Sequence, residues 1–213
     1  MNDPCFVCVA FGPLYVEQQK RLKESILAIY PNAPLLFWTD ELPPGSKSFY
    51  KSLYGFKPHA VNVAIERGYK QIVFFDPAVI LEGRMDYYQS IVKDYGVLAV
   101  QDANKLNRFC YDKALKHFSL VRHKIQDWHL VGGSFYYFDF DLPQCKVIFD
   151  KWIAAERIGL FGSQQEQASE RLHGHRSDEA IMSLALYTSG SRPLSGDTRY
   201  NCDGGIVMKK HFK

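Results

Sequence analysis

Short apolar runs alternate with helical apolar stripes along the first half of the chain. The runs at 5–10, 35–38 and 71–75 are nearly continuous in apolar residues, which predicts buried strands. Between them, apolar residues recur at helical spacing over 22–30 and 60–65, which predicts two helices. This β-α-β-α-β order predicts a mainly parallel sheet with helices on both of its faces.

The second half of the chain has fewer regular alternations. Apolar runs at 97–100 and 131–138 predict two more strands. Helical spacing after Pro143 predicts a further helix, and Ser177 marks the expected start of a last one. No linker-like segment separates the two halves, so we expect both to belong to the same α/β domain.

The composition is that of a globular protein. Of the 213 residues, 46% are hydrophobic and 23% are charged, so a packed core is expected over a single domain, residues 1–213. Aromatic residues reach 15%, which is typical of a sheet-rich core or of a site that stacks flat ligands. The net charge of +3 is too mild for a dedicated nucleic-acid binder and fits a pocket for an anionic small molecule.

Targeting and redox signals are weak. No apolar run approaches the roughly 18 residues that span a bilayer, and the first residues lack the features of a secretory signal. The five cysteines are scattered and form no Cys-x-x-Cys pair, which indicates reduced thiols and a cytoplasmic location. Residues 208–213 do not resemble a natural chain end, so we expect the chain to be a piece of a longer protein.

Several common enzyme signatures are missing from the sequence. It contains no GxxxxGK[ST] loop, no GxGxxG after the first predicted strand, and no GxSxG, HExxH or kinase signature. The first strand leads instead into Gly12-Pro13. A nucleotide would therefore be held by strand ends and a metal ion rather than by a glycine-rich loop.

The candidate chemistry is concentrated around the third predicted strand. This strand, 71–75, delivers Asp76 to its carboxyl end, where ligands bind in such sheets. Asp76 by itself fits equally well as a turn residue before Pro77. Upstream, however, a helix opens with the sequence KPHA at 57–60 and closes with GY at 68–69.

This order of motifs resembles that of the GT-A glycosyltransferases, enzymes that use nucleotide sugars. In that family a KP-x-A helix, a GY turn and a strand ending in Asp-x-Asp follow one another, and the resemblance covers most of the chain. Glycogenin-like and galactosyltransferase-like retaining families are the most similar. The overall match also resembles virus-encoded, capsid-glycosylating enzymes of the chlorella-virus type, which would place the protein in the host cytoplasm.

The resemblance implies a GT-A (Rossmann-like) α/β fold and a transferase activity. A hexose or deoxyhexose would move from a UDP-sugar to a glycan or glycoprotein acceptor, and the most similar families favour retention of the anomeric configuration. A divalent cation, Mn²⁺ or Mg²⁺, is also implied, because it neutralises the diphosphate leaving group as a Lewis acid.

The expected metal site departs from the family pattern. Asp76 takes the place of the first acid of Asp-x-Asp, but Ala78 stands where the second acid is expected. This leaves open weak metal binding, a different ligand set, an inactive enzyme or an engineered substitution. His211 is a candidate third ligand that would favour manganese, with a basic tail as the alternative interpretation.

The resemblance assigns nucleotide contacts to the ends of the first two strands and to the KPHA helix. Asp40 would accept a hydrogen bond from uracil N3–H, unless it is only a turn residue. Backbone groups of Ala10 and Phe11 would hold the other edge of the base, and Tyr15 would stack on it. Lys57 would pair with the diphosphate, with a solvated lysine at a helix start as the alternative.

Sugar contacts are implied farther along the chain. Gly132 and Gly133 resemble the glycine pair beneath the transferred sugar, where a missing side chain permits close approach. Gln101 and Asp102 follow a predicted strand and would bind sugar hydroxyls. Trp128 is a candidate for stacking on an acceptor sugar, or a core residue.

The segment before the last predicted helix resembles the acidic loop of GT-A enzymes that reaches the anomeric centre. Asp178 is the first candidate for the catalytic carboxylate and Glu179 the second. The residue would be a general base in an inverting enzyme and would stabilise an oxocarbenium-like state in a retaining one. A helix cap by Ser177 or Asp178 is the simpler interpretation. The His173–His175 pair lacks neighbouring ligands at zinc spacing.

Two other functions remain open. A sugar nucleotidyltransferase shares this style of fold, but it needs a glycine- and basic-rich loop after the first strand, which residues 11–14 do not supply. A catalytically impaired nucleotide-sugar or glycan-binding module is motivated by Ala78. Such a module would show no donor hydrolysis in the presence of manganese.

Overall fold

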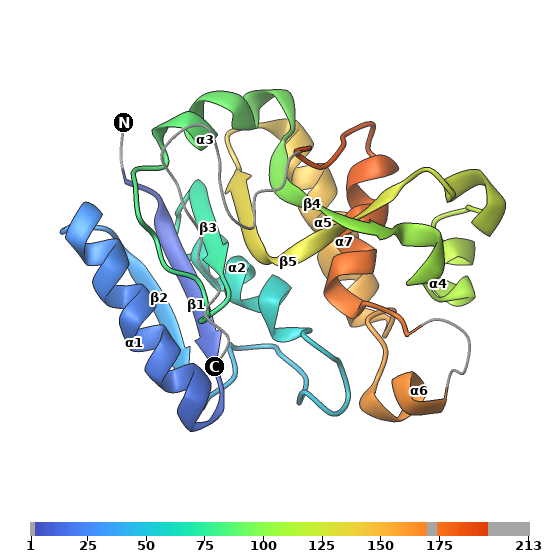
Figure 1. The fold of residues 1–213 in the computed structure, drawn as a ribbon, viewed down its shortest axis with the longest axis horizontal. Helices are drawn as coiled ribbons and strands as arrows, with labels where there is room; N and C mark the ends of the chain where they lie inside the picture. Colours follow the sequence, from blue (N-terminus) through green and yellow to red (C-terminus); the bar gives the residue numbers. More distant parts are fainter. Residues whose placement is uncertain (1–2, 170–173, 196–213) are drawn as a thin grey trace.

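The computed structural model describes residues 3–169 and 174–195 and shows a five-stranded sheet with helices on both faces (Figure 1). The strands are β1 (Cys5–Ala10), β2 (Leu35–Thr39), β3 (Gln71–Phe75), β4 (Val97–Lys105) and β5 (His129–Asp139). Their order across the sheet is β2-β1-β3-β5-β4. β1 pairs in parallel with β2 and β3, while β5 is antiparallel to both β3 and β4. All strands except β5 therefore point the same way, so the predicted mainly parallel sheet is confirmed.

The helices form two layers. They are α1 (Gly12–Ile29), α2 (Phe56–Glu66), α3 (Asp86–Ile91), α4 (Asp112–His117), α5 (Pro143–Arg157), α6 (Gln164–Ser169) and α7 (Ser177–Tyr187). α2, α5 and α7 pack on one face of the sheet, and α1 and α3 pack on the other. In Figure 1, α4 and α6 lie at the end of the molecule opposite to α1. Within the described residues, no helix is long and apolar enough to cross a membrane.

Strand alternation explains why the sheet has two apolar faces. Successive side chains of a strand point to opposite sides, and every residue of β1 is buried. Phe6 and Cys8 pack with Leu22 and Ile26 of α1, while Val7 packs on the α2 side. A continuous apolar run is therefore the pattern of a central strand covered on both faces.

Two elements differ from their predicted extents. β4 runs through Gln101 and Asp102 to Lys105 instead of ending at Val100, with register shifts in its pairing to β5. α1 begins already at Gly12, ten residues before the apolar stripe at 22–30 from which the helix was predicted, because a proline is accommodated in the first turn of a helix. Asp40 Oδ1 accepts a hydrogen bond from the Gly12 backbone N–H at 2.7 Å, which satisfies one free donor of that first turn.

The described cysteines are chemically quiet. Cys5, Cys8, Cys110 and Cys145 are buried and free, and Cys202 lies outside the described residues. Burial raises the pKa of the Cys5 and Cys110 thiols to about 12, so these groups stay protonated at neutral pH.

Candidate active site

A buried ammonium group joins four elements at the carboxyl ends of the parallel strands. Lys57, in the first turn of α2, places Nζ 2.8 Å from Asp178 Oδ2 and 3.3 Å from Asp76 Oδ1. It also donates to the Gly133 carbonyl at 2.8 Å. The ammonium thus donates two hydrogen bonds, to Asp178 and to Gly133, and makes an ion pair with Asp76. The structure thus brings together Lys57, Asp76, Gly133 and Asp178, four of the residues singled out from the sequence.

Glycine at position 133 is required by close approach. A Cβ atom there would lie 2.9 Å from Asp178 Oδ2 and 3.0 Å from Lys57 Nζ. At Gly132, by contrast, the nearest atom of the described residues to such a Cβ is the Val100 carbonyl oxygen at 4.0 Å. Only the second glycine of the pair therefore makes room for the ion cluster.

The carboxylates of Asp76, Asp178 and Glu179 all interact electrostatically with Lys57. Burial raises the pKa of Asp178 to about 7, against the attraction of Lys57 and with the help of the Glu179 and Asp76 charges. Burial opposes the charge of Lys57, but Asp178 and Asp76 together hold its pKa above the ordinary value. The cluster therefore keeps a charged ammonium, while Asp178 binds a proton more readily than an exposed carboxylate does.

The two acids at the start of α7 differ in accessibility. The Asp178 side chain is 4% exposed, and Tyr136 Oη lies 3.4 Å from its Oδ2. The Glu179 side chain is 16% exposed and accepts hydrogen bonds from Gly133 N at 3.0 Å and from Arg176 Nε at 2.7 Å. Glu179 is thus the more accessible of the two, and Asp178 lies behind the surface.

The helix-cap interpretation of this segment is wrong. α7 begins at Ser177 with Arg176 as its N-cap, and no side-chain hydrogen bond caps it. The Ser177 hydroxyl is buried without a hydrogen-bond partner among the described residues. The Asp178 carboxylate faces Lys57 instead of the helix amides.

An aromatic cleft of about 650 Å³ opens beside Asp76. It is lined by Val9, Phe11, Leu14, Tyr15, Gln18, Leu42, Ser48, Phe49, Tyr50, Tyr54, Phe56, Asp76, Pro77 and Ala78. Asp76 contributes the cleft's carboxylate, and its side chain is 25% exposed. The cleft thus combines flat apolar walls with an anionic inner end.

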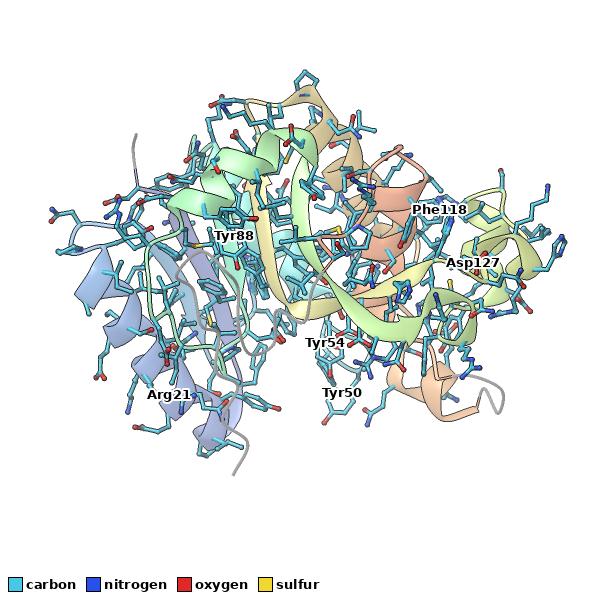
Figure 2. All side chains as sticks on the ribbon, turned by 45° about the horizontal axis from the view of Figure 1, so that its top comes forward. Arg21, Tyr50, Tyr54, Tyr88, Phe118 and Asp127 are labelled. Carbon is cyan, nitrogen blue, oxygen red and sulfur yellow. The ribbon has the colours of Figure 1, made fainter. Side chains whose placement is uncertain are left out.

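Sequence reasoning missed one wall of this cleft. Phe49, Tyr50 and Tyr54 lie in residues 40–55, which connect β2 to α2 without regular secondary structure. Figure 2 shows Tyr50 and Tyr54 on the same side of the molecule, between α1 and α6. The detectable signal was three aromatic residues within a short polar loop, directly before the KPHA helix.

The predicted nucleotide contacts have mixed placements. Phe11 and Tyr15 line the cleft, as their assigned role requires. The Ala10 carbonyl accepts the Asp40 backbone N–H at 2.9 Å, so one of its two lone pairs is engaged within the protein. Asp40 has a left-handed φ of 55°, and one of its carboxylate oxygens accepts the hydrogen bond from Gly12 N–H. Asp40 is therefore a turn residue that also caps the first turn of α1. Its contact with uracil stays a prediction.

The described residues do not fit a divalent-ion site. Asp76 is already paired with Lys57, and Ala78 lines the cleft without offering a carboxylate. Arg21 Nη2 lies 3.4 Å from the Ala78 carbonyl oxygen, which adds positive charge beside that turn. Within 3–169 and 174–195, no group of three or more His, Cys, Asp or Glu residues is placed to hold a metal ion. The candidate ligand His211 lies outside these ranges.

Other predicted contacts lie away from the cleft. The Gln101 backbone N–H donates to the Leu194 carbonyl, and Asp102 Oδ1 accepts from the Asn104 backbone N–H. Neither residue lines the cleft beside Asp76. Trp128 stacks on Tyr187 with ring centroids 4.5 Å apart and packs against the core, so its core interpretation accounts for it.

His175 has a structural role. The ring is buried between the Leu160 carbonyl at 2.9 Å and the Tyr111 N–H at 3.3 Å. Burial lowers the pKa of His175 to about 4, so it stays neutral at physiological pH. Its sequence neighbour His173 lies outside the described residues.

Comparison with known proteins supports the fold. No protein-family model matches the sequence, and no curated protein matches it. The similar solved structures include the WbbM bifunctional glycosyltransferase (TM-score 0.53, 12% identity) and mouse xyloside xylosyltransferase 1 (TM-score 0.53, 9% identity). The alignments cover 93% and 99% of this chain, and 39% and 98% of those proteins. This likeness confirms the predicted GT-A-type α/β fold.

A third solved structure bears on the viral expectation. A glycosyltransferase involved in glycosylation of the major capsid of PBCV-1 aligns over 92% of this chain and 84% of its own, with a TM-score of 0.48 and 10% identity. Likeness at that level carries no conclusion about this chain. The viral setting stays a prediction from the sequence.

Proposed function

We propose that the chain is a glycosyltransferase that moves a hexose or deoxyhexose from a UDP-sugar to a glycan or glycoprotein acceptor. The observation that carries the proposal is the junction of an aromatic cleft with the buried Lys57 cluster, at the carboxyl ends of the parallel strands. Open α/β sheets bind their ligands at this edge. The fold shared with solved glycosyltransferases supports the same activity.

In this proposal, the aromatic walls hold the base. Phe11 and Tyr15 come from the end of β1 and the start of α1, and Tyr50 comes from the loop after β2. Flat rings on both sides of a cleft suit a planar base, which loses apolar surface to them on stacking. The second carboxylate oxygen of Asp40, which follows β2, is the proposed acceptor for uracil N3–H.

The Lys57 cluster organises the sugar end. The donors of Lys57 are already engaged, so we assign it to holding Asp76 and Asp178 in place rather than to the diphosphate. The bond between the anomeric carbon and the diphosphate breaks, and the leaving oxygen keeps the electron pair. The acceptor hydroxyl oxygen then bonds to that carbon, and its proton passes to the departing diphosphate oxygen. The carboxylates of Asp178 and Glu179 favour the positive charge that develops on the sugar, and we favour retention.

Nucleotide binding is the direct test. We expect UDP to bind more tightly than GDP in a calorimetric titration, and Tyr15→Ala to weaken UDP binding about tenfold, since base stacking on an aromatic ring contributes about 1–3 kcal/mol. The matched control is Tyr87→Ala, because Tyr87 is a similarly exposed tyrosine on α3 that does not line the cleft. A wild-type chain that binds no UDP, with or without Mn²⁺, contradicts the proposal.

Catalysis is tested separately from binding. Release of free sugar from a panel of UDP-sugars in the presence of Mn²⁺ is the expected activity. UDP binding without any hydrolysis or transfer would instead identify the impaired binding module that Ala78 suggests. Consumption of UTP with a sugar 1-phosphate would identify a nucleotidyltransferase.

Metal dependence is tested by restoring the second acid. A divalent cation, Mn²⁺ or Mg²⁺, supplies charge neutralisation to a diphosphate when it is bound. Ala78→Asp adds a second carboxylate to the cleft next to Asp76, so we expect manganese-dependent activity to rise. Titration with Mn²⁺ alone provides an independent readout. Activity of the Asp variant equal to or below that of wild type counts against a metal-assisted mechanism.

The cellular setting is part of the proposal. We place the protein in the cytoplasm, where thiols stay reduced, and in the host cytoplasm if its gene is viral. The buried free thiols of Cys5, Cys8, Cys110 and Cys145 support that location.

A further inference from the structure

The outer wall of the cleft is built from an irregular loop. Phe49, Tyr50 and Tyr54 lie between β2 and α2, and Tyr50 is 72% exposed. Large aromatic side chains on a loop without secondary structure have many alternative positions, and ordering them costs conformational entropy. Such a wall is ready for a ligand only if other contacts hold its backbone.

A fully buried carboxylate supplies these contacts. Glu156, near the end of α5, has no exposed surface. Its Oε2 lies 2.9 Å from His59 Nε2 of α2, and its Oε1 lies 3.4 Å from Lys47 Nζ of the loop. Lys47 Nζ also donates to the carbonyls of Glu156 and Arg157, both at 3.0 Å. The loop is therefore tied to the C-terminal end of α5, where carbonyl groups attract a cation.

The backbone of the loop is fixed next to this anchor. Leu53 N donates to the Gly162 carbonyl at 3.0 Å, and Gln164 N donates to the Tyr50 carbonyl at 3.2 Å. A Cβ atom on Gly55 would lie 2.9 Å from Glu156 Oε1, so the chain passes the carboxylate too closely for a side chain. These contacts bracket the aromatic residues on both sides.

The charge state of Glu156 agrees with an anchoring role. Burial alone would raise its pKa, but the hydrogen bond with His59 and the charge of Lys47 hold that pKa below its usual value. A buried charge is costly unless several partners satisfy it. An apolar residue would fill the same space without directional bonds, whereas the carboxylate fixes both Lys47 and His59.

The wall also touches the reacting end of the site. The Tyr54 ring centroid lies 5.1 Å from Lys57 Nζ, and the Phe49 and Tyr54 rings meet edge to face with centroids 5.3 Å apart. Displacement of the loop would therefore reach both the base cleft and the surroundings of the ion cluster.

We propose that Glu156 is a positioning residue that, through Lys47 and His59, holds the Phe49–Tyr54 wall where it receives the planar base of the nucleotide. The proposal rests on the proposed function, because it takes UDP as the ligand of the cleft. Glu156 itself does not contact the ligand. Its effect is to preorganise the aromatic wall, so that less conformational entropy is lost when the nucleotide binds.

The experiment weakens the contact between Lys47 and Glu156 from each side. Lys47→Ala deletes the ammonium without opening the core, and Glu156→Gln removes the charge while keeping the shape. The matched control is Lys146→Ala, which removes an exposed lysine of α5 that pairs with Asp150. Amide hydrogen exchange of residues 46–55 is measured without nucleotide, and UDP affinity is measured by calorimetry.

We expect faster exchange over 46–55 and about tenfold weaker UDP binding in Lys47→Ala and Glu156→Gln, with neither change in Lys146→Ala. Unchanged exchange in both anchor variants overturns the proposal. So does faster exchange with wild-type UDP affinity, because the wall would then be ordered without serving the nucleotide. A wild-type chain that fails to bind UDP overturns the proposed function first, and faster exchange in the variants would still identify the anchor.

Discussion

Replacement of Lys57 by Met is expected to lower the free energy of unfolding by about 3–5 kcal/mol and to abolish any transfer activity. The methionine fills much of the same space but leaves Asp178 and Asp76 without their shared counter-ion. Leaving a buried carboxylate without its counter-ion lowers the free energy of unfolding far more than breaking an exposed ion pair does. Urea unfolding provides the measurement, with Lys20→Met as control, since Lys20 pairs with Glu17 in an exposed position.

The same variant has a predictable pH dependence. Burial already raises the pKa of Asp178 to about 7, and removal of Lys57 removes an attraction that opposes this rise. Unfolding returns Asp178 to an ordinary carboxyl pKa of about 4. The folded variant therefore takes up this proton at a higher pH than the folded wild-type protein does. The stability lost by the variant is largest at high pH and shrinks as the pH falls through the variant's raised pKa toward about 7, the folded wild-type value. The double variant Lys57→Met/Asp178→Asn is expected to recover part of the stability at pH 8.

The second large effect is expected for Gly133→Ala. The added Cβ would lie 2.9–3.0 Å from Asp178 Oδ2, Glu179 Cγ and Lys57 Nζ. These atoms belong to buried or hydrogen-bonded side chains, so they cannot withdraw without breaking the ion cluster. We expect a stability loss of about 1–3 kcal/mol, as for overpacking of a core, together with loss of transfer.

Gly132→Ala is the matched control for that substitution. It makes the same chemical change one position earlier on β5, where no atom of the described residues lies closer than 4.0 Å to a Cβ. Its effect on unfolding is expected to stay within about 0.5 kcal/mol. Equal melting temperatures for the two alanine variants would show that the close approach at Gly133 does not constrain the cluster.

The central strands could be predicted from the sequence. The apolar runs at 5–10 and 71–75 coincide with β1 and β3, because a strand covered on both faces needs apolar side chains at every position. The helix expected after Pro143 is α5. The direction of β5 was harder to predict, because direction depends on which neighbours a strand pairs with and not on its own residues.

The candidate site, like the fold, could be predicted from the sequence only in part. The order of its motifs pointed to Lys57, Asp76, Gly133 and Asp178, and the structure places them in contact although Lys57 and Asp178 are 121 residues apart. The aromatic wall at 49–54 was missed, because an irregular loop has no periodicity to reveal which side chains it exposes.

The sequence by itself therefore determined which chemical groups are available and in which strands and helices most of them lie. Apolar periodicity and the order of motifs are properties of the chain itself. They can be detected without knowing which residues are neighbours in space. Only the tertiary structure decided what each group does. The sequence predicted that Lys57 pairs with the diphosphate. Packing of α7 and β5 around Lys57 instead turns its ammonium group toward the protein. Burial and charge pairing depend on everything that surrounds a side chain, and those surroundings come from distant parts of the chain.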